Sequence, residues 1–143
     1  MRHRKHTFKV GRTSSHIKAM LANQVCSLIT EKKINTTLVK AKETRRIADN
    51  MVTLAKKGTL HDRRRAISKL HDETAVKILF DEIGPKFATR NGGYTQIIQL
   101  GKRIGDAAEM CILQWVGENE AVAKETKKKE KKEVSETKKE VKE

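Results

Sequence analysis

The sequence predicts an α+β fold, a two-layer domain in which helices cover one face of a small mixed three-stranded sheet. One observation is the order of patterns along the chain, in which helical spacing and short extended runs give helix, strand, three helices and two strands. Another is composition, because only 36% of the 143 residues are hydrophobic, which allows a core but only a small one. No internal repeat divides the chain, so we expect a single domain.

The first half of the chain predicts two helices with a strand between them. The first helix begins at a capping serine, Ser14 or Ser15, and extends to about Lys32 with apolar residues at three- and four-residue spacing. The β-branched run Ile34–Val39 is too short for a helix and predicts the first strand. Helical spacing returns over Lys40–Lys57.

Capping signals then predict two shorter helices. Gly58 stands where the residue after a helix commonly lies. Thr59 and Asp62 resemble a capping box that opens a brief helix. Asp72 caps a further helix, which we expect to end at Gly84-Pro85 because this is the only proline in the chain.

The rest of the body predicts a loop and a hairpin. Lys86–Gly93 has no periodicity, and its Asn91-Gly92-Gly93 sequence favours a sharp turn. Tyr94–Leu100 and Glu109–Val116 are extended candidates, and the glycines within Gly101–Ala108 suit a hairpin connection between them.

Several functional classes are excluded by what the sequence lacks. Cys26 and Cys111 are far apart without CxxC or paired histidines, so we expect two buried thiols in a reduced cytosolic chain, with no disulfide and no zinc. No phosphate-binding loop, GxSxG or HExxH motif occurs, so we predict no enzyme activity, cofactor, metal or small-molecule substrate. No apolar run is long enough for a membrane span or follows a signal-type start, so we expect neither insertion nor export.

The charge of the chain indicates a polyanionic partner. Lys and Arg number 32 against 18 acidic residues, a formal net charge of +14. Lys124–Glu143 holds nine Lys and six Glu and cannot form a core. Without this segment, the first 123 residues have a net charge of +11. We therefore divide the chain into a basic RNA-binding arm at 1–12, a globular domain at 13–117 and a disordered tail at 118–143.

The arm is the strongest candidate for binding nucleic acid, because it has no acidic residue and almost nothing to bury. Arginine and lysine bind phosphate oxygens, and an unfolded backbone can follow a groove that a rigid helix cannot enter. A solvated terminus remains the alternative. The candidates in this region, which precedes the first acidic residue Glu31, are Arg2, His3, Arg4, Lys5, His6, Lys9, Arg12 and His16.

Two further sets of residues lie in the body. A phosphate-facing surface is predicted for the cations of the second and third helices, although a merely solvated face is the competing interpretation. Glycine-rich turns, where backbone N–H groups can approach phosphate, carry the other set. The helix set is Lys40, Lys42, Arg45, Arg46, Lys56, Lys57, Arg63, Arg64 and Arg65, and the turn set is Arg90, Asn91, Lys102 and Arg103.

The scarcity of aromatic residues predicts how the nucleic acid is recognised. At 3% of the chain, they cannot form the stacking platforms that read single strands, and packing over the sheet is favoured over base stacking for Tyr94. We expect recognition of folded RNA through backbone, shape and 2′-hydroxyl contacts. The alternative is a nucleoid-type DNA-binding protein, which the charge allows but which no recognition helix or dimerising heptad supports.

The order and spacing of several motifs resemble one family over Met1 to about Val116. These motifs are Met1–Arg4, Gly11-Arg12, His16, Asn35–Thr37, Lys40–Glu43, Leu54–Gly58, Arg63-Arg64, Arg90–Thr95 and Gly105–Ala108. Together they are similar to the bacterial large-subunit ribosomal protein L17 family.

The resemblance implies more than the residues do by themselves. It implies a two-layer domain with a basic N-terminal extension, bound to large-subunit ribosomal RNA (rRNA) on the outer side of the subunit near the peptide exit, where it helps assembly. It also implies a non-enzymatic protein located in cytoplasmic ribosomes. The neighbouring partner that it suggests is the thirty-second protein of the large subunit.

Overall fold

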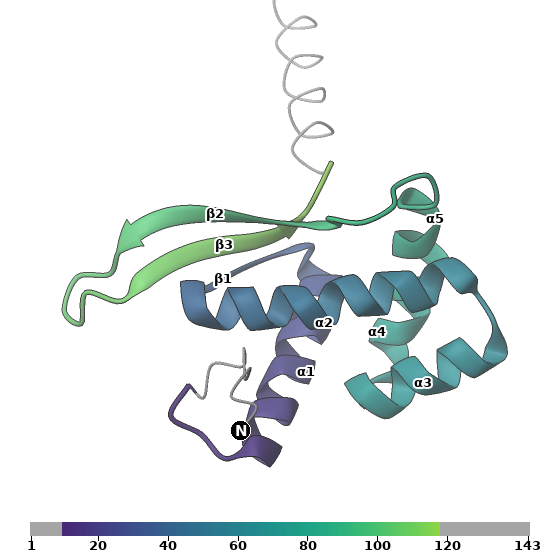
Figure 1. The fold of residues 1–143 in the computed structure, drawn as a ribbon, viewed down its shortest axis with the longest axis horizontal. Helices are drawn as coiled ribbons and strands as arrows, with labels where there is room; N and C mark the ends of the chain where they lie inside the picture. Colours follow the sequence, from purple (N-terminus) through teal and green to yellow (C-terminus); the bar gives the residue numbers. More distant parts are fainter. Residues whose placement is uncertain (1–9, 118–143) are drawn as a thin grey trace, which may run out of the picture.

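The computed structural model describes residues 10–117, which form helices on one side of a three-stranded sheet (Figure 1). The predicted α+β class is confirmed, and so is the order of elements. Helix α2 runs along the sheet, and α1 passes behind α2 at a steep angle (Figure 1). Helices α3, α4 and α5 lie near the C-terminal end of α2 (Figure 1). The elements are α1 (Ser14–Glu31), β1 (Lys33–Thr37), α2 (Leu38–Lys57), α3 (Leu60–Leu70), α4 (Glu73–Ile78), a π-helical turn η1 (Leu79–Ile83), α5 (Gly84–Lys86), β2 (Thr95–Lys102) and β3 (Glu109–Trp115).

The sheet is antiparallel throughout, so the prediction of a mixed sheet is wrong. Its strand order is β1-β3-β2, with Thr36 opposite Cys111 in one pair and Ile97 opposite Leu113 in the other. Strands β1 and β2 run in the same direction, but β3 lies between them and pairs antiparallel with both. A mixed sheet would require β1 and β2 to be neighbours.

The boundary between β1 and α2 lies earlier than predicted. The strand ends at Thr37 instead of Val39, and the helix begins at Leu38 instead of Lys40. Thr37 keeps extended backbone angles as the N-cap of α2. At its other end, α2 finishes as predicted, where Gly58 has a φ of 69° and its N–H donates to the Leu54 carbonyl.

The helix that begins after Asp72 was predicted to end at Gly84-Pro85, and this prediction is wrong. The helical segment continues through η1 and α5 to Lys86. In the π-helical turn η1, the Gly84 N–H donates to the Leu79 carbonyl, five residues earlier. Pro85 therefore enters the first turn of α5, the part of a helix in which a proline is best tolerated.

The predicted caps of the middle helices are confirmed. Thr59 Oγ1 accepts the Asp62 N–H at 3.1 Å, and Asp72 Oδ1 accepts the N–H groups of Thr74 and Ala75 at 2.9 and 3.1 Å. The prediction of a serine cap for α1 is wrong, because Ser14 is already helical and Thr13 occupies the N-cap position without a side-chain hydrogen bond.

The core lies between the sheet and the helices. The Trp115 indole Nε1 donates to the Leu28 carbonyl at 3.0 Å, which fastens β3 to α1. Cys111 is fully buried, as predicted, whereas Cys26 is only partly buried. Both are free thiols, and burial raises the pKa of each.

Candidate nucleic-acid interface

The structure describes only part of the predicted arm. Arg12 and His16 are exposed at the start of α1. The other candidates of this region, Arg2, His3, Arg4, Lys5, His6 and Lys9, lie outside the described residues.

The exposed face of α2 carries the densest group of predicted cations. Ala48, Met51 and Ala55 are buried against the core, and the helical period places other residues on the opposite side. We call this surface the α2 face and define it by four exposed residues, Lys42, Arg45, Arg46 and Lys57. Lys40 and Lys56 lie at its edges and are half-buried.

Two arginines of the α2 face pair with acids of the same helix. The Arg45 Nε lies 3.8 Å from Asp49 Oδ2, and the Arg46 Nη1 lies 3.3 Å from Glu43 Oε2. The Glu43 side chain is only 6% exposed, so Arg46 compensates a buried carboxylate. Lys42 and Lys57 have no ion pair within residues 10–117, and their charge is available to an external anion.

The three arginines of α3 have different environments. Arg63 is half-buried, lies 3.4 Å from the Asp81 carboxylate and stacks 4.9 Å from the centroid of the Phe80 ring. Arg65 is exposed and lies 3.9 Å from Asp62. Arg64 is exposed and has no ion pair within residues 10–117. Arg63 therefore stabilises the fold, while Arg64 is the arginine most available to a partner.

The predicted turn set is not one site. Arg90 and Asn91 lie in the loop before β2, whereas Lys102 and Arg103 lie at the other end of that strand, near the β2–β3 turn (Figure 1). All four are exposed. They can therefore contact an extended partner at two places but cannot hold one phosphate together.

The β2–β3 turn contains a tight exposed ion pair. Arg103 donates from Nε and Nη2 to the two Asp106 carboxylate oxygens at 3.0 and 2.6 Å. These hydrogen bonds raise the pKa of Arg103 and, together with the Ala108 N–H, lower the pKa of Asp106 to about 2. The pair neutralises Arg103 locally, which leaves Lys102 as the uncompensated cation of this turn.

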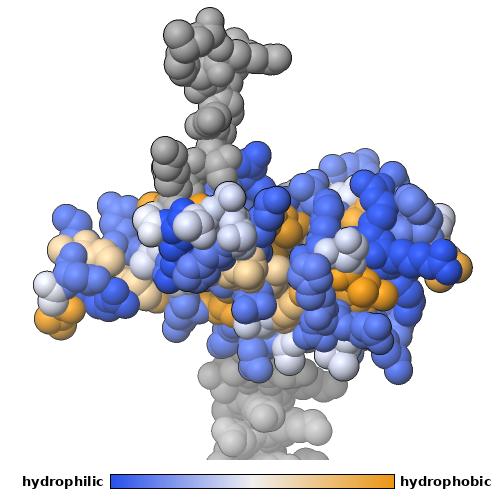
Figure 2. Space-filling view, turned by 90° about the horizontal axis from the view of Figure 1, so that it is seen from below, coloured by the Kyte–Doolittle hydropathy of each residue, from blue (hydrophilic) through white to orange (hydrophobic). Residues whose placement is uncertain are grey.

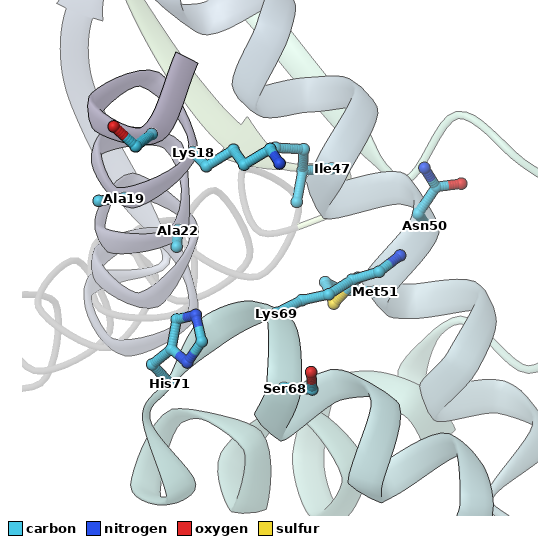
Figure 3. Close-up of a pocket in the computed structure, with 10 residues that line it drawn as sticks. Lys18, Ala19, Ala22, Ile47, Asn50, Met51, Ser68, Lys69 and His71 are labelled. Carbon is cyan, nitrogen blue, oxygen red and sulfur yellow. The ribbon is translucent and has the colours of Figure 1, made fainter. Parts of the chain in front are cut away.

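Three basic residues that sequence reasoning did not select lie around a cavity between α1, α2 and α3 (Figure 3). They are Lys18, Lys69 and His71. Lys69 and His71 lie together at the end of α3, whereas Lys18 comes from α1, about 50 residues earlier, so no local spacing could have grouped all three. The cavity has a volume of about 590 Å³.

The face viewed in Figure 2 is mainly hydrophilic, with smaller hydrophobic areas between the polar side chains and at both ends. Within residues 10–117, no cluster of His, Cys, Asp and Glu could hold a metal ion. No described helix is long and apolar enough to cross a membrane.

The fold and this surface define a small basic α+β protein with cations spread over helix faces and turns. The family model described as Ribosomal protein L17 matches residues 20–116. The chain belongs to the ribosomal protein L17 family, which confirms the resemblance found in the sequence.

Curated relatives cover most of this chain. The large ribosomal subunit protein bL17 of Alkaliphilus metalliredigens is 56% identical over 108 residues, which are 76% of this chain and 96% of the relative. The protein of the same name from Methylacidiphilum infernorum is 47% identical over 80% of this chain and 88% of its own length. The protein of the same name from Allorhizobium ampelinum is 52% identical over 81% of this chain and 82% of its own length.

Proposed function

We propose that this protein is a structural constituent of the large ribosomal subunit, where it binds and stabilises folded large-subunit rRNA near the peptide exit. Its place is then the cytoplasmic ribosome, and its role is not catalytic. Membership of the L17 family and the names of the relatives support the ribosomal role. Neighbouring large-subunit proteins, among them the thirty-second, are its protein partners in this proposal.

The observation that carries RNA binding is the set of exposed cations without an acidic partner within residues 10–117. Lys42 and Lys57 lie on the α2 face and are 15 residues apart, a separation of about 22 Å along the helix. Arg64 continues this charge onto α3, and Lys102 extends it to the hairpin. Such a spread of charge suits a phosphate backbone better than a small anion.

Burial of the aromatic rings supports recognition through phosphate, sugar and shape. Phe80, Phe87, Tyr94 and Trp115 are each at most 8% exposed. Tyr94 packs against Phe87 with 5.3 Å between ring centroids. The prediction that its ring packs within the fold instead of stacking on a base is therefore confirmed. No aromatic ring of residues 10–117 is available as a platform for bases.

The arm has a separate role in the proposal. Residues 1–12 enter the folded RNA, while residues 13–117 dock on its surface and residues 118–143 take no part in binding. Arg2, Arg4, Lys5, Lys9 and Arg12 neutralise phosphates that would otherwise repel one another as RNA helices approach.

Salt dependence of binding tests the arm. With all five arm bases replaced by alanine, the slope of log affinity against log salt for large-subunit rRNA should flatten by about three to four units. The matched control removes the same charge from the tail by replacing Lys127, Lys128, Lys129, Lys131 and Lys132 with alanine. The control should leave the slope nearly unchanged, and an equal effect of both variants would remove the arm from the proposal.

Sedimentation tests the ribosomal role itself. In cell extracts at high and low magnesium, the full chain should migrate with large subunits. Migration with the nucleoid would instead support the DNA-binding alternative. A protein found free of both would overturn the proposed function.

A further inference from the structure

The cavity between α1, α2 and α3 combines an apolar floor with a basic rim. Its volume of about 590 Å³ falls within the roughly 300–1,000 Å³ of typical small-ligand sites. The lining residues are Ser15, Lys18, Ala19, Ala22, Ile47, Asn50, Met51, Ser68, Lys69 and His71. None of these ten is acidic and three are basic, so the lining favours an anionic or neutral occupant over a cationic one.

The floor suits a flat apolar surface. Ala22 and Met51 are buried, and Ile47 is half-buried beside them. Small alanines on α1 leave the space open, while methionine adapts its shape to what lies against it. A nucleobase can bury its faces between such aliphatic side chains without an aromatic platform.

The rim places positive charge on two sides of the opening. Lys18 extends from α1 toward Ile47, and Lys69 extends from α3 across Met51 toward Asn50 (Figure 3). Both lysines are exposed and have no ion pair within residues 10–117. The two ammonium groups come from different helices, so each can contact one of the two phosphates that flank a nucleotide.

His71 closes the third side. It ends α3 with a φ of 57°, and its ring lies near Ala22 of α1 (Figure 3). The next residue, Asp72, is the nearest acid in sequence, but its Oδ1 is occupied by the backbone N–H groups of Thr74 and Ala75. That carboxylate does not line this cavity but lines a neighbouring one, which lies beyond Ala22 and His71.

Polar groups at the edge can read a base. The side chains of Asn50 and Ser68 line the cavity and make no hydrogen bond with another side chain or the backbone of residues 10–117. An amide and a hydroxyl each offer both a donor and an acceptor, which suits the hydrogen-bonding edge of a base.

We infer that this cavity, here called the α1–α3 cavity, receives one unstacked nucleotide of the RNA, with its base on the apolar floor and its phosphates at Lys18 and Lys69. The inference rests on the proposed function, because it names a specific contact with the bound RNA. A basic protein segment is a poorer occupant, since the cationic rim would repel it. The contact supplies one base-dependent anchor to a surface that otherwise binds backbone.

A cavity-filling variant tests the inference in the full chain. Ala19 is exposed on α1 at the cavity, so Ala19→Phe should fill the space without disturbing the core. Thr30→Phe is the matched control, because Thr30 is exposed on the same side of α1 three turns further along and does not line the cavity. Circular dichroism and thermal unfolding should show both variants folded like the parent.

Binding to large-subunit rRNA and base-specific chemical probing give the readout. Ala19→Phe should weaken binding about tenfold and restore chemical reactivity at one nucleotide that the parent protects, and the salt slope should flatten by no more than the roughly one to two units that loss of both phosphate contacts would cause. Thr30→Phe should match the parent in both measurements. Lys18→Ala/Lys69→Ala, which alters only exposed side chains, should flatten the slope by about one to two units and expose the same nucleotide.

The possible failures are distinguishable. If the parent chain does not bind the rRNA, the proposed function fails. If the parent binds and Ala19→Phe binds equally with an unchanged probing pattern, the nucleotide site is overturned and the proposed function stands. Normal rRNA binding by Ala19→Phe with loss of a neighbouring protein from assembled subunits would also overturn it, in favour of a protein occupant.

Discussion

The ammonium group of Lys56 donates a 2.6 Å hydrogen bond to the backbone carbonyl of Arg90 and lies 5.6 Å from the centroid of the Tyr94 ring. The contact joins the last turn of α2 to the loop before β2. Lys56, which the sequence placed among the phosphate-binding cations, is therefore a structural tie between two segments that are 34 residues apart.

Replacing Lys56 should affect stability more than RNA binding. Lys56→Gln removes a charged hydrogen bond to a carbonyl, and with the partial exposure of the side chain we expect a loss of about 1 kcal/mol in the free energy of unfolding. Lys57→Gln is the control, because Lys57 is exposed on the α2 face. Urea unfolding should show a lower free energy of unfolding for Lys56→Gln than for Lys57→Gln. The salt slope of rRNA binding should change mainly in Lys57→Gln. The reverse pattern would contradict the structural role of Lys56.

The Arg103–Asp106 pair should make the β2–β3 turn sensitive to acid. The pKa of Asp106 is lowered to about 2, mainly by the hydrogen bonds from Arg103, against about 3.9 for an unfolded aspartate. Because the folded pKa is the lower one, its stabilisation is present above about pH 4 and is lost as the pH falls through 2. NMR titration of the Asp106 carboxyl and the Ala108 amide should show this transition. Asp106→Asn should abolish it, and titration of Asp106 near pH 4 would refute the pairing.

The hydrogen bond from Trp115 to Leu28 should be costly to remove. Trp115→Phe leaves the buried Leu28 carbonyl without its donor and removes volume from the core, so we expect a loss of about 2–4 kcal/mol. Ile112→Val in the same strand deletes one methylene from a half-buried side chain without unpairing a polar atom and should cost less than about 1 kcal/mol. Chemical unfolding followed by circular dichroism compares them. Equal costs would mean that the indole hydrogen bond contributes little.

Gly84 should be required for the close approach of α5 to α2. A Cβ at this position would meet the Ala55 Cβ at 3.2 Å and the Ala55 carbonyl oxygen at 3.3 Å. Ala55 belongs to a buried helix backbone, which cannot yield easily, so Gly84→Ala should destabilise by about 1 kcal/mol despite the helix preference of alanine. In a double-mutant cycle, Ala55→Gly should remove only part of this penalty, because the backbone carbonyl of residue 55 stays in place. A stabilising Gly84→Ala would show that the two helices can separate at no cost.

Local patterns were sufficient to predict the main helices and the caps of α3 and α4, but not the cap of α1. The apolar period of α2 and the capping residues Thr59 and Asp72 act within a few residues, so the sequence around them contains the necessary information. The hairpin was equally local. The continuation of the helix through Pro85 was not, because the π-helical turn that accommodates it forms where η1 packs against α2.

The candidate surface was predictable only in outline. Charge density indicated α2 and α3, but Arg63 and Asp81 are 18 residues apart in different helical segments, so their pairing could not be inferred from spacing. The i, i+3 pair of Arg46 and Glu43 could have been predicted, although not the burial of that carboxylate. The α1–α3 cavity could not be predicted from the sequence, because its lining residues come together only when α1, α2 and α3 pack.

The central position of β3 has a consequence for synthesis. Strand β1 is made early and β2 later, yet neither has a partner in the sheet until β3, the last described element, has been translated. Closing the sheet brings Thr36 to Cys111 across most of the chain, a slow step of high contact order. A nascent chain halted before Glu109 would carry two unpaired strands, so most of the polypeptide must leave the ribosome before the protein is protected from aggregation.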